Sequence, residues 1–109
     1  MAYDEGLAHR VLGLLGDQPS LVEKKMFGGV GYMVQGNMAC GVNGKDLIVR
    51  VGPDRYQETL AQPHARPFDM TGRPMTGWVM VDAGGTASES DLADWVQQGV
   101  VFALTLPAK

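Results

Sequence analysis

Three charged residues that could bind a ligand, Arg66, Asp69 and Arg73, lie close together in the stretch ARPFDMTGRPMTGW (65–78). Guanidinium groups donate paired hydrogen bonds to carboxylates and phosphates, so the stretch could bind an anion or an acidic protein surface. The other interpretation is structural: Asp69 neutralises one arginine, and the aromatic, proline and glycine residues dock the segment on the core. Residue chemistry favours the structural interpretation, although loops that carry specific polar groups are often functional.

Metal and nucleophile chemistry have little support in the sequence. The two histidines, His9 and His64, lack the close spacing of zinc ligands, so no metal site is predicted. The single cysteine, Cys40, lies within an expected strand, where a small buried thiol is the simpler interpretation. There is no G-x-S-x-G motif and no visible nucleophile–base pair. The sequence therefore predicts no catalytic residue, no cofactor and no enzyme activity.

Length and composition indicate a single domain over residues 1–109, which is long enough for one hydrophobic core. No apolar run approaches the roughly 20 residues that cross a bilayer, so membrane spanning is not expected. The N-terminus opens with acidic residues and does not resemble a secretory signal. One cysteine excludes an internal disulfide, which suits the cytoplasm, the predicted location.

The net charge of −3 argues against an autonomous nucleic-acid binder. Residues 74–109 contain one lysine, Lys109, and four acidic residues, so this part of the chain is expected to present an acidic face. Weak nucleic-acid binding through the basic residues that precede it is the alternative functional hypothesis. These basic residues are Lys24, Lys25, Arg50, Arg66 and Arg73.

Apolar spacing predicts a first helix over residues 4–15. Its apolar stripe consists of Leu7, Val11, Leu14 and Leu15. Residues 22–34 then read as two strands joined at the pair Gly28-Gly29. Phosphate-binding glycines lead into a helix N-terminus, whereas these lead into a strand, so we interpret them as a turn or bulge.

A hairpin is predicted over residues 38–51, with Asn43-Gly44 as its turn. Asn-Gly suits a two-residue type I′ turn because both positions tolerate positive φ. A second helix is expected to begin at Pro53, where the missing N–H costs nothing, and to end at Pro63.

After the 65–78 stretch, residues 78–81 form a short apolar strand. The last helix is expected to start at Ser88, which resembles a capping box together with Asp91, and to end at Pro107. Gly99 in its middle should cost about 1 kcal/mol relative to alanine unless another element packs closely there.

These elements predict an α+β fold in the order α-β(4)-α-β-α, with two layers, an antiparallel sheet and the helices on one face. The 65–78 stretch is then the one long irregular connection. Most methionines are expected to fill the core, whereas Met70 and Met75 belong to this stretch. Sheet edges can pair with a second copy, so homodimerisation stays open.

Three motifs resemble the N-terminal domain of the TfoX/Sxy family, bacterial proteins named for regulators of natural competence. They are EKKMFGGVGYMVQGNMACGV (23–42), DLIVRVGPDRY (46–56) and ARPFDMTGRPMTGWVMV (65–81). The resemblance is to short stand-alone members and implies a two-layer α+β fold similar to that of secretion chaperones. Longer members add a C-terminal domain that resembles helix-hairpin-helix modules, which this chain lacks, and they are coactivators that work with the cyclic-AMP receptor protein.

The resemblance implies a non-enzymatic interaction module that acts through protein contacts, an accessory to transcription or competence regulation. The family supplies no established catalytic residues. We predict that the partner, a transcription regulator in the simplest case, contacts the 65–78 stretch and neighbouring basic residues. The predicted contact residues are Lys24, Lys25, Arg50, Arg66, Asp69, Met70, Arg73, Met75 and Trp78.

Overall fold

The computed structural model describes residues 3–18, 20–26, 28–69, 72 and 75–108. Six strands form one antiparallel sheet in the order β1-β2-β3-β4-β6-β5. The strands are β1 (Val22–Met26), β2 (Gly29–Val34), β3 (Asn37–Asn43), β4 (Asp46–Arg50), β5 (Ala65–Pro67) and β6 (Trp78–Val81). The helices are α1 (Glu5–Leu15), α2 (Tyr56–Leu60) and α3 (Glu89–Thr105), with 3₁₀ turns η1 (Pro53–Arg55) and η2 (Ala83–Gly85).

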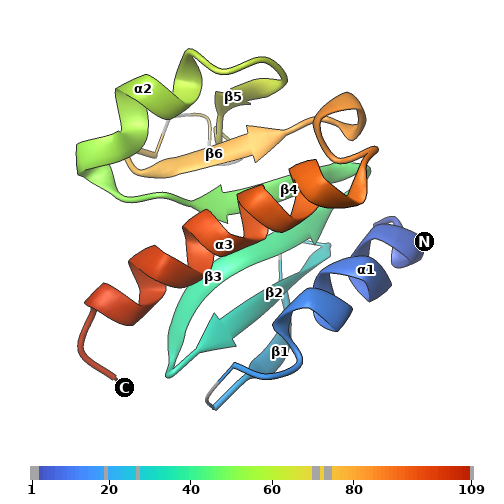
Figure 1. Cartoon of the computed structure of the whole chain (residues 1–109), viewed down its shortest axis with the longest axis vertical. Coiled ribbons are helices and arrows are strands. Elements are labelled where there is room, and N and C mark those ends of the chain that lie inside the picture. Colours follow the sequence, from blue (N-terminus) through green and yellow to red (C-terminus); the bar gives the residue numbers. More distant parts are fainter. Residues whose placement is uncertain (1–2, 19, 27, 70–71, 73–74, 109) are drawn as a thin grey trace.

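The helices cover one face of the sheet, as Figure 1 shows for α1 and α3. Tyr56 of α2 is buried in the same apolar cluster as residues of α1, α3 and the strands, so α2 packs on this face too. The predicted α+β fold with helices on one face of an antiparallel sheet is therefore confirmed. In the part of the chain that the structure describes, no helix is both long and apolar enough to cross a membrane.

Alternation along the central strands places their apolar side chains against the helices. Val30, Tyr32 and Val34 of β2 are buried in the helix-side core. The Tyr32 hydroxyl donates a hydrogen bond of 3.1 Å to the carbonyl oxygen of Ala8 in α1. On α1 itself, Leu14 was predicted to face inward but is 38% exposed, because Leu15 takes the inward position at the end of the stripe.

Helix α3 approaches the sheet closely at Gly99. A Cβ atom at this position would overlap the carbonyl oxygen of Ala39 in β3. From the sequence, Gly99 is expected to destabilise the helix unless another element packs closely there. That close packing is present, because the missing side chain lets α3 lie directly on β3. At its start, the Ser88 hydroxyl accepts a hydrogen bond of 3.1 Å from the Asp91 N–H, which confirms the predicted cap.

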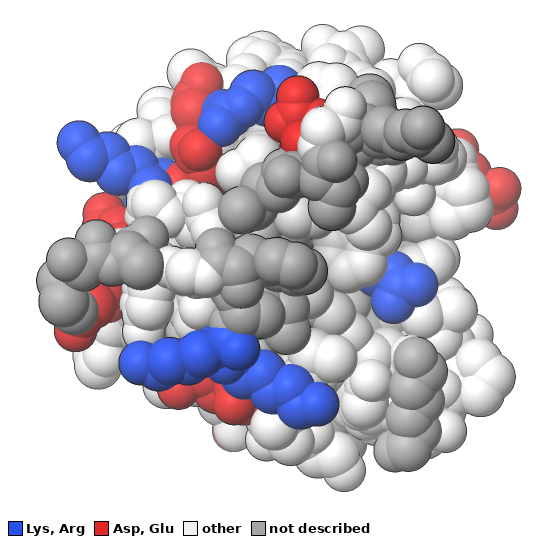
Figure 2. Space-filling model, turned by 180° about the vertical axis from the view of Figure 1, so that it is seen from behind, with Lys and Arg blue, Asp and Glu red and all other residues white. Residues whose placement is uncertain are grey.

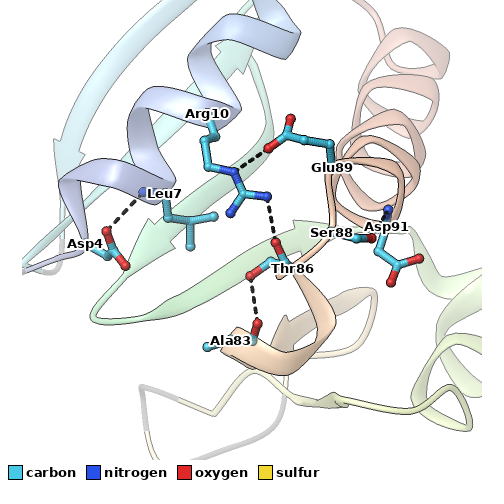
Figure 3. Close-up of polar contacts among 8 residues, drawn as sticks. All are labelled: Asp4, Leu7, Arg10, Ala83, Thr86, Ser88, Glu89 and Asp91. Carbon is cyan, nitrogen blue, oxygen red and sulfur yellow. Dashed lines mark hydrogen bonds and ion pairs between the residues drawn. The ribbon is translucent and has the colours of Figure 1, made fainter.

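Arg10 connects α1 to the start of α3 (Figure 3). Its Nε donates to Oε1 of Glu89 at 2.6 Å, and its Nη2 donates to the carbonyl oxygen of Thr86 at 2.8 Å. Asp4 caps α1 by accepting from the Leu7 N–H at 3.0 Å. These contacts fix the two helices side by side over the sheet.

The turn between β3 and β4 differs from the sequence prediction. Asn43 pairs with Asp46 as part of the ladder, so the loop is Gly44-Lys45 and only Gly44 has positive φ. The shift places Leu47 opposite Val42 in the core and leaves Lys45 outside the ladder. Positive φ at both loop positions, the type I′ pattern, occurs instead at residues 35–36 between β2 and β3.

The chain order also contains one strand that the sequence did not predict. Ala65–Pro67 forms β5 at the sheet edge and pairs with β6, with Arg66 opposite Met80. Three residues are too few to show alternation, and a proline in a strand reads as a break although an edge position tolerates it. The 65–78 stretch therefore begins with a strand, β5, and ends at the first residue of β6.

Candidate functional site

The described residues of the connection between β5 and β6 pack on part of the sheet face that the helices leave open. Ile48 and Met80 point to this face, and Phe68 is buried against them at 5% exposure. The Met75 N–H donates to the carbonyl oxygen of Phe68, and the Trp78 N–H donates to that of Met75, both at 3.0 Å. The apolar members of the predicted contact surface, Met75 and Trp78, thus pack on the sheet.

The charged members of this segment lie at its exposed side. Nη2 of Arg66 donates to Oδ2 of Asp46 in β4 at 2.5 Å, and the Arg66 side chain is 47% exposed. The ion-pair partner of Arg66 is therefore Asp46. Arg73, the other arginine that Asp69 was predicted to neutralise, lies outside the described residues. Asp69 is exposed, and its carbonyl oxygen accepts from the Gly72 N–H at 2.8 Å. We call Arg66, Asp46 and Asp69 the charged edge.

Two predicted contact residues, Met70 and Arg73, lie outside the described residues. The structure therefore places neither of them, and the predicted cluster of Arg66, Asp69 and Arg73 stays a prediction.

Arg50 is held between two aromatic rings. Its Cζ lies 5.0 Å from the centroid of Trp78 and 5.3 Å from that of Phe102 in α3. Cation–π contacts of this kind are worth about 0.5–1 kcal/mol each at partly exposed sites. Arg50 therefore braces the end of β4 against α3, and its guanidinium is less free to contact a ligand than the sequence implied.

The basic residues proposed for nucleic-acid binding are distributed over the sheet. Lys24 and Lys25 lie on β1 at one edge, whereas Arg66 lies on β5 at the opposite edge, with four strands between them. Nζ of Lys25 is 5.7 Å from the centroid of the Tyr3 ring. On the described part of the face opposite α1 and α3, basic and acidic side chains are interspersed (Figure 2). Among the basic residues that the structure describes, this arrangement gives no continuous basic track for a phosphate backbone.

Burial makes the side chains of Cys40 and Tyr32 poor nucleophiles, because it disfavours their ionised forms. Cys40 is buried in the helix-side core, and this burial raises the pKa of its thiol to about 12. The thiolate needed for nucleophilic attack is therefore not formed near neutral pH. Burial, with a smaller contribution from Glu23, also raises the pKa of the Tyr32 hydroxyl. Within the described chain, no group of three His, Cys, Asp or Glu side chains could hold a metal ion.

A groove that the sequence did not single out lies between α2 and α3. Its volume is about 380 Å³. Its lining residues are Arg55, Gln62, Asp91, Asp94, Trp95, Gln97 and Gln98. The sequence predicted an acidic face from residues 74–109, and Asp91 and Asp94 of the groove belong to it. It could not predict the groove itself, because Arg55 and Gln62 on the other side come from a distant part of the chain.

The comparison with known families gives a match over most of the chain. A family model described as TfoX N-terminal domain matches residues 13–103. The match covers all three motifs quoted above, at residues 23–42, 46–56 and 65–81. Comparisons with curated proteins and with solved structures gave no match.

Proposed function

Because the chain belongs to the TfoX N-terminal domain family, we propose that it is a non-enzymatic interaction module and an accessory to transcription or competence regulation. The family supports a regulatory type of domain, and the proposal adds that the domain works by contacting a protein partner. We place the contact at the charged edge formed by Arg66, Asp46 and Asp69.

The observation that carries this proposal is the division of the 65–78 segment into an anchored and an exposed part. Phe68 is buried and Met75 is half-buried against the sheet, whereas Arg66 and Asp69 remain exposed beside them. Anchoring lowers the entropy that the segment would lose on binding, so its charges are presented in a preorganised form. Exposed charge pairs contribute little to stability, which leaves these residues available for recognition.

Photo-cross-linking in cells tests the proposal. A p-benzoylphenylalanine at position 69 should cross-link to one protein, identified by mass spectrometry as a transcription regulator. The same group at position 17, an exposed position after α1, serves as the control and should not give this adduct. The charge reversal Arg66→Glu should remove the position-69 adduct because it inverts the field that the partner meets.

The melting temperature of the Arg66→Glu variant must stay close to that of the parent for this reading to hold. Identical adducts from positions 69 and 17 would contradict the proposal. A position-69 adduct that persists in Arg66→Glu would place the contact elsewhere.

A further inference from the structure

Strand β1 forms one edge of the sheet, and in the part of the chain that the structure describes it pairs with β2 only. It has five residues and contains no proline. The opposite edge strand, β5, has three residues and includes Pro67, which has no N–H to donate. A complete edge strand presents backbone N–H and C=O groups that can pair with another strand. β1 is therefore the edge that is better suited to extend the sheet.

The charged side chains of β1 on the helix side have opposite signs. Glu23 lies opposite Tyr32 of β2, which is buried beneath the helices. Lys25 lies opposite Val30, which is buried in the same core. Cross-strand neighbours share a face of the sheet, so Glu23 and Lys25 both lie on the helix side. Both are exposed, and neither forms an ion pair with any residue that the structure describes.

Symmetry restricts how two copies of this edge can meet. Two antiparallel copies of β1 are related by a twofold axis perpendicular to the sheet, so the helices of both copies lie on the same side. Residues that lie opposite each other must then share a face, which places the axis at a residue and not between two residues. With the axis at Lys24, Glu23 of each copy lies opposite Lys25 of the other. An axis at Glu23 or at Lys25 would instead bring like charges together.

We propose that the protein forms a homodimer through β1, in which the two sheets join into one antiparallel sheet with Lys24 at the twofold axis. Two pairs of Glu23 with Lys25 across the seam supply the charge complementarity. Exposed lysines usually protect an edge strand from pairing, but a second copy of β1 brings a carboxylate to each Lys25. The two copies of Lys24 face each other on the open side of the sheet, which weakens the dimer and makes it dependent on protein concentration.

Helix α1 adds an apolar side chain on the same side of the molecule. Leu12 is 38% exposed, and together with Glu23 and Tyr32 it lines a pocket of about 170 Å³ between α1 and the first two strands. Arg10, which contacts α3, lies on the other side of α1, because two helical positions differ by about 200°. Figure 1 shows α1 on the side of the sheet that ends in β1. In the dimer, Leu12 of each copy therefore lies toward the seam.

The dimer edge is separate from the charged edge proposed for the protein partner. β1 and β5 lie at the two ends of the strand order. Substitutions in β1 should therefore leave the cross-link from position 69 intact. The failure of one proposal is thus distinguishable from the failure of the other.

Sedimentation velocity over a concentration series tests the dimer. The average mass of the protein should rise from that of a monomer toward that of a dimer as the concentration increases. Amide hydrogen exchange should slow at alternate positions of β1 in the concentrated sample, and β5 should be unaffected. A monomer at every concentration, or protection that increases in β5 instead of β1, would overturn the proposal.

Charge exchange tests the register. Glu23→Lys and Lys25→Glu each place like charges across the seam, so each should raise the dimer dissociation constant about tenfold or more. An equimolar mixture of the two variants should form a heterodimer, because both cross-strand pairs then have opposite charges. A chain that carries both substitutions should dimerise like the parent for the same reason. Dimers of either single variant as strong as the parent, or no recovery in the mixture, would contradict this register.

Matched variants separate the edge contact from a general effect of net charge. Asp94→Lys and Lys45→Glu make the same two changes in net charge at exposed positions outside β1 and should leave the dissociation constant unchanged. Lys24→Gln should lower the dissociation constant several-fold, since it removes the like charges at the axis. Circular dichroism should show all these variants folded, because the substituted side chains are exposed. Equal weakening by the variants inside and outside β1 would refute the proposed edge.

Discussion

The two faces of the sheet are covered in different ways. Three helices with regular apolar spacing cover one face, and most of the strand side chains beneath them are fully buried. On the other face, the described part of the connection after β5 buries Phe68 against Ile48 and Met80. A segment without periodicity can therefore form part of a core, provided that a few large side chains anchor it.

The two faces also use their polar residues differently. On the helix face, polar groups such as Arg10 and Ser88 join or cap helices. On the opposite face, the anchoring residues are apolar, and the charges of Arg66 and Asp69 stay at the surface. Substitutions on the two faces should therefore differ in how much they lower the free energy of unfolding and in whether they affect packing or surface charge.

The largest effect is expected where α3 touches β3. Gly99→Ala should lower the free energy of unfolding by more than about 3 kcal/mol, because the new Cβ meets the backbone oxygen of Ala39, which cannot move cheaply. Gly13→Ala in α1 is the matched control, since a Cβ there meets nothing within 4 Å. It should stabilise the protein by about 0.5–1 kcal/mol through helix propensity. Similar urea midpoints for the two variants would rule out the close α3–β3 contact.

On the other face, Phe68→Ala should cost about 3 kcal/mol, at the low end for a buried phenylalanine. The connecting segment can relax toward the sheet more easily than a helix can, which limits the loss. Urea unfolding measures the change, and hydrogen exchange should show faster exchange of the Met75 and Trp78 amides. A stability equal to that of the parent would mean that the segment is not anchored through Phe68.

A smaller effect is expected at the cap that starts α3. Ser88→Ala should cost about 1 kcal/mol because the Asp91 N–H loses its acceptor. Ser90→Ala, at an exposed position inside the same helix, is the control and should change stability little. Thermal unfolding of the two variants distinguishes a capping effect from a general effect of removing a hydroxyl.

The smallest effect is expected at the charged edge. Arg66→Ala should change the free energy of unfolding by less than about 0.5 kcal/mol, since the side chain is 47% exposed and its ion pair with Asp46 is screened by solvent. The contrast with Phe68→Ala is the sharpest test of the division within this segment. A loss comparable to that of Phe68→Ala would show that Arg66 is structural and would remove the basis for a contact surface there.

Much of the fold could be predicted from the sequence because it depends on short-range patterns. The alternation in β2, the capping pair Ser88 and Asp91, and the strand over residues 78–81 all follow from neighbours within a few positions. The strand at Ala65–Pro67 escaped this reasoning because three residues carry no period. The predicted loop of the β3–β4 hairpin was wrong by one residue because Asn-Gly specifies only a local turn preference, whereas the pairing of Asn43 with Asp46 depends on the whole ladder between the two strands.

The candidate sites depend on contacts between distant parts of the chain. Arg66 and Asp46 are 20 positions apart, and the groove joins Arg55 to residues of α3. The sequence by itself determined where most helices and strands form and that residues 74–109 are acidic, because these properties are local. Only the tertiary structure decided which charges meet, which face the irregular segment packs on and which strands lie at the edges of the sheet. Those outcomes depend on the packing of the helices and the pairing of the strands, and no local pattern specifies them.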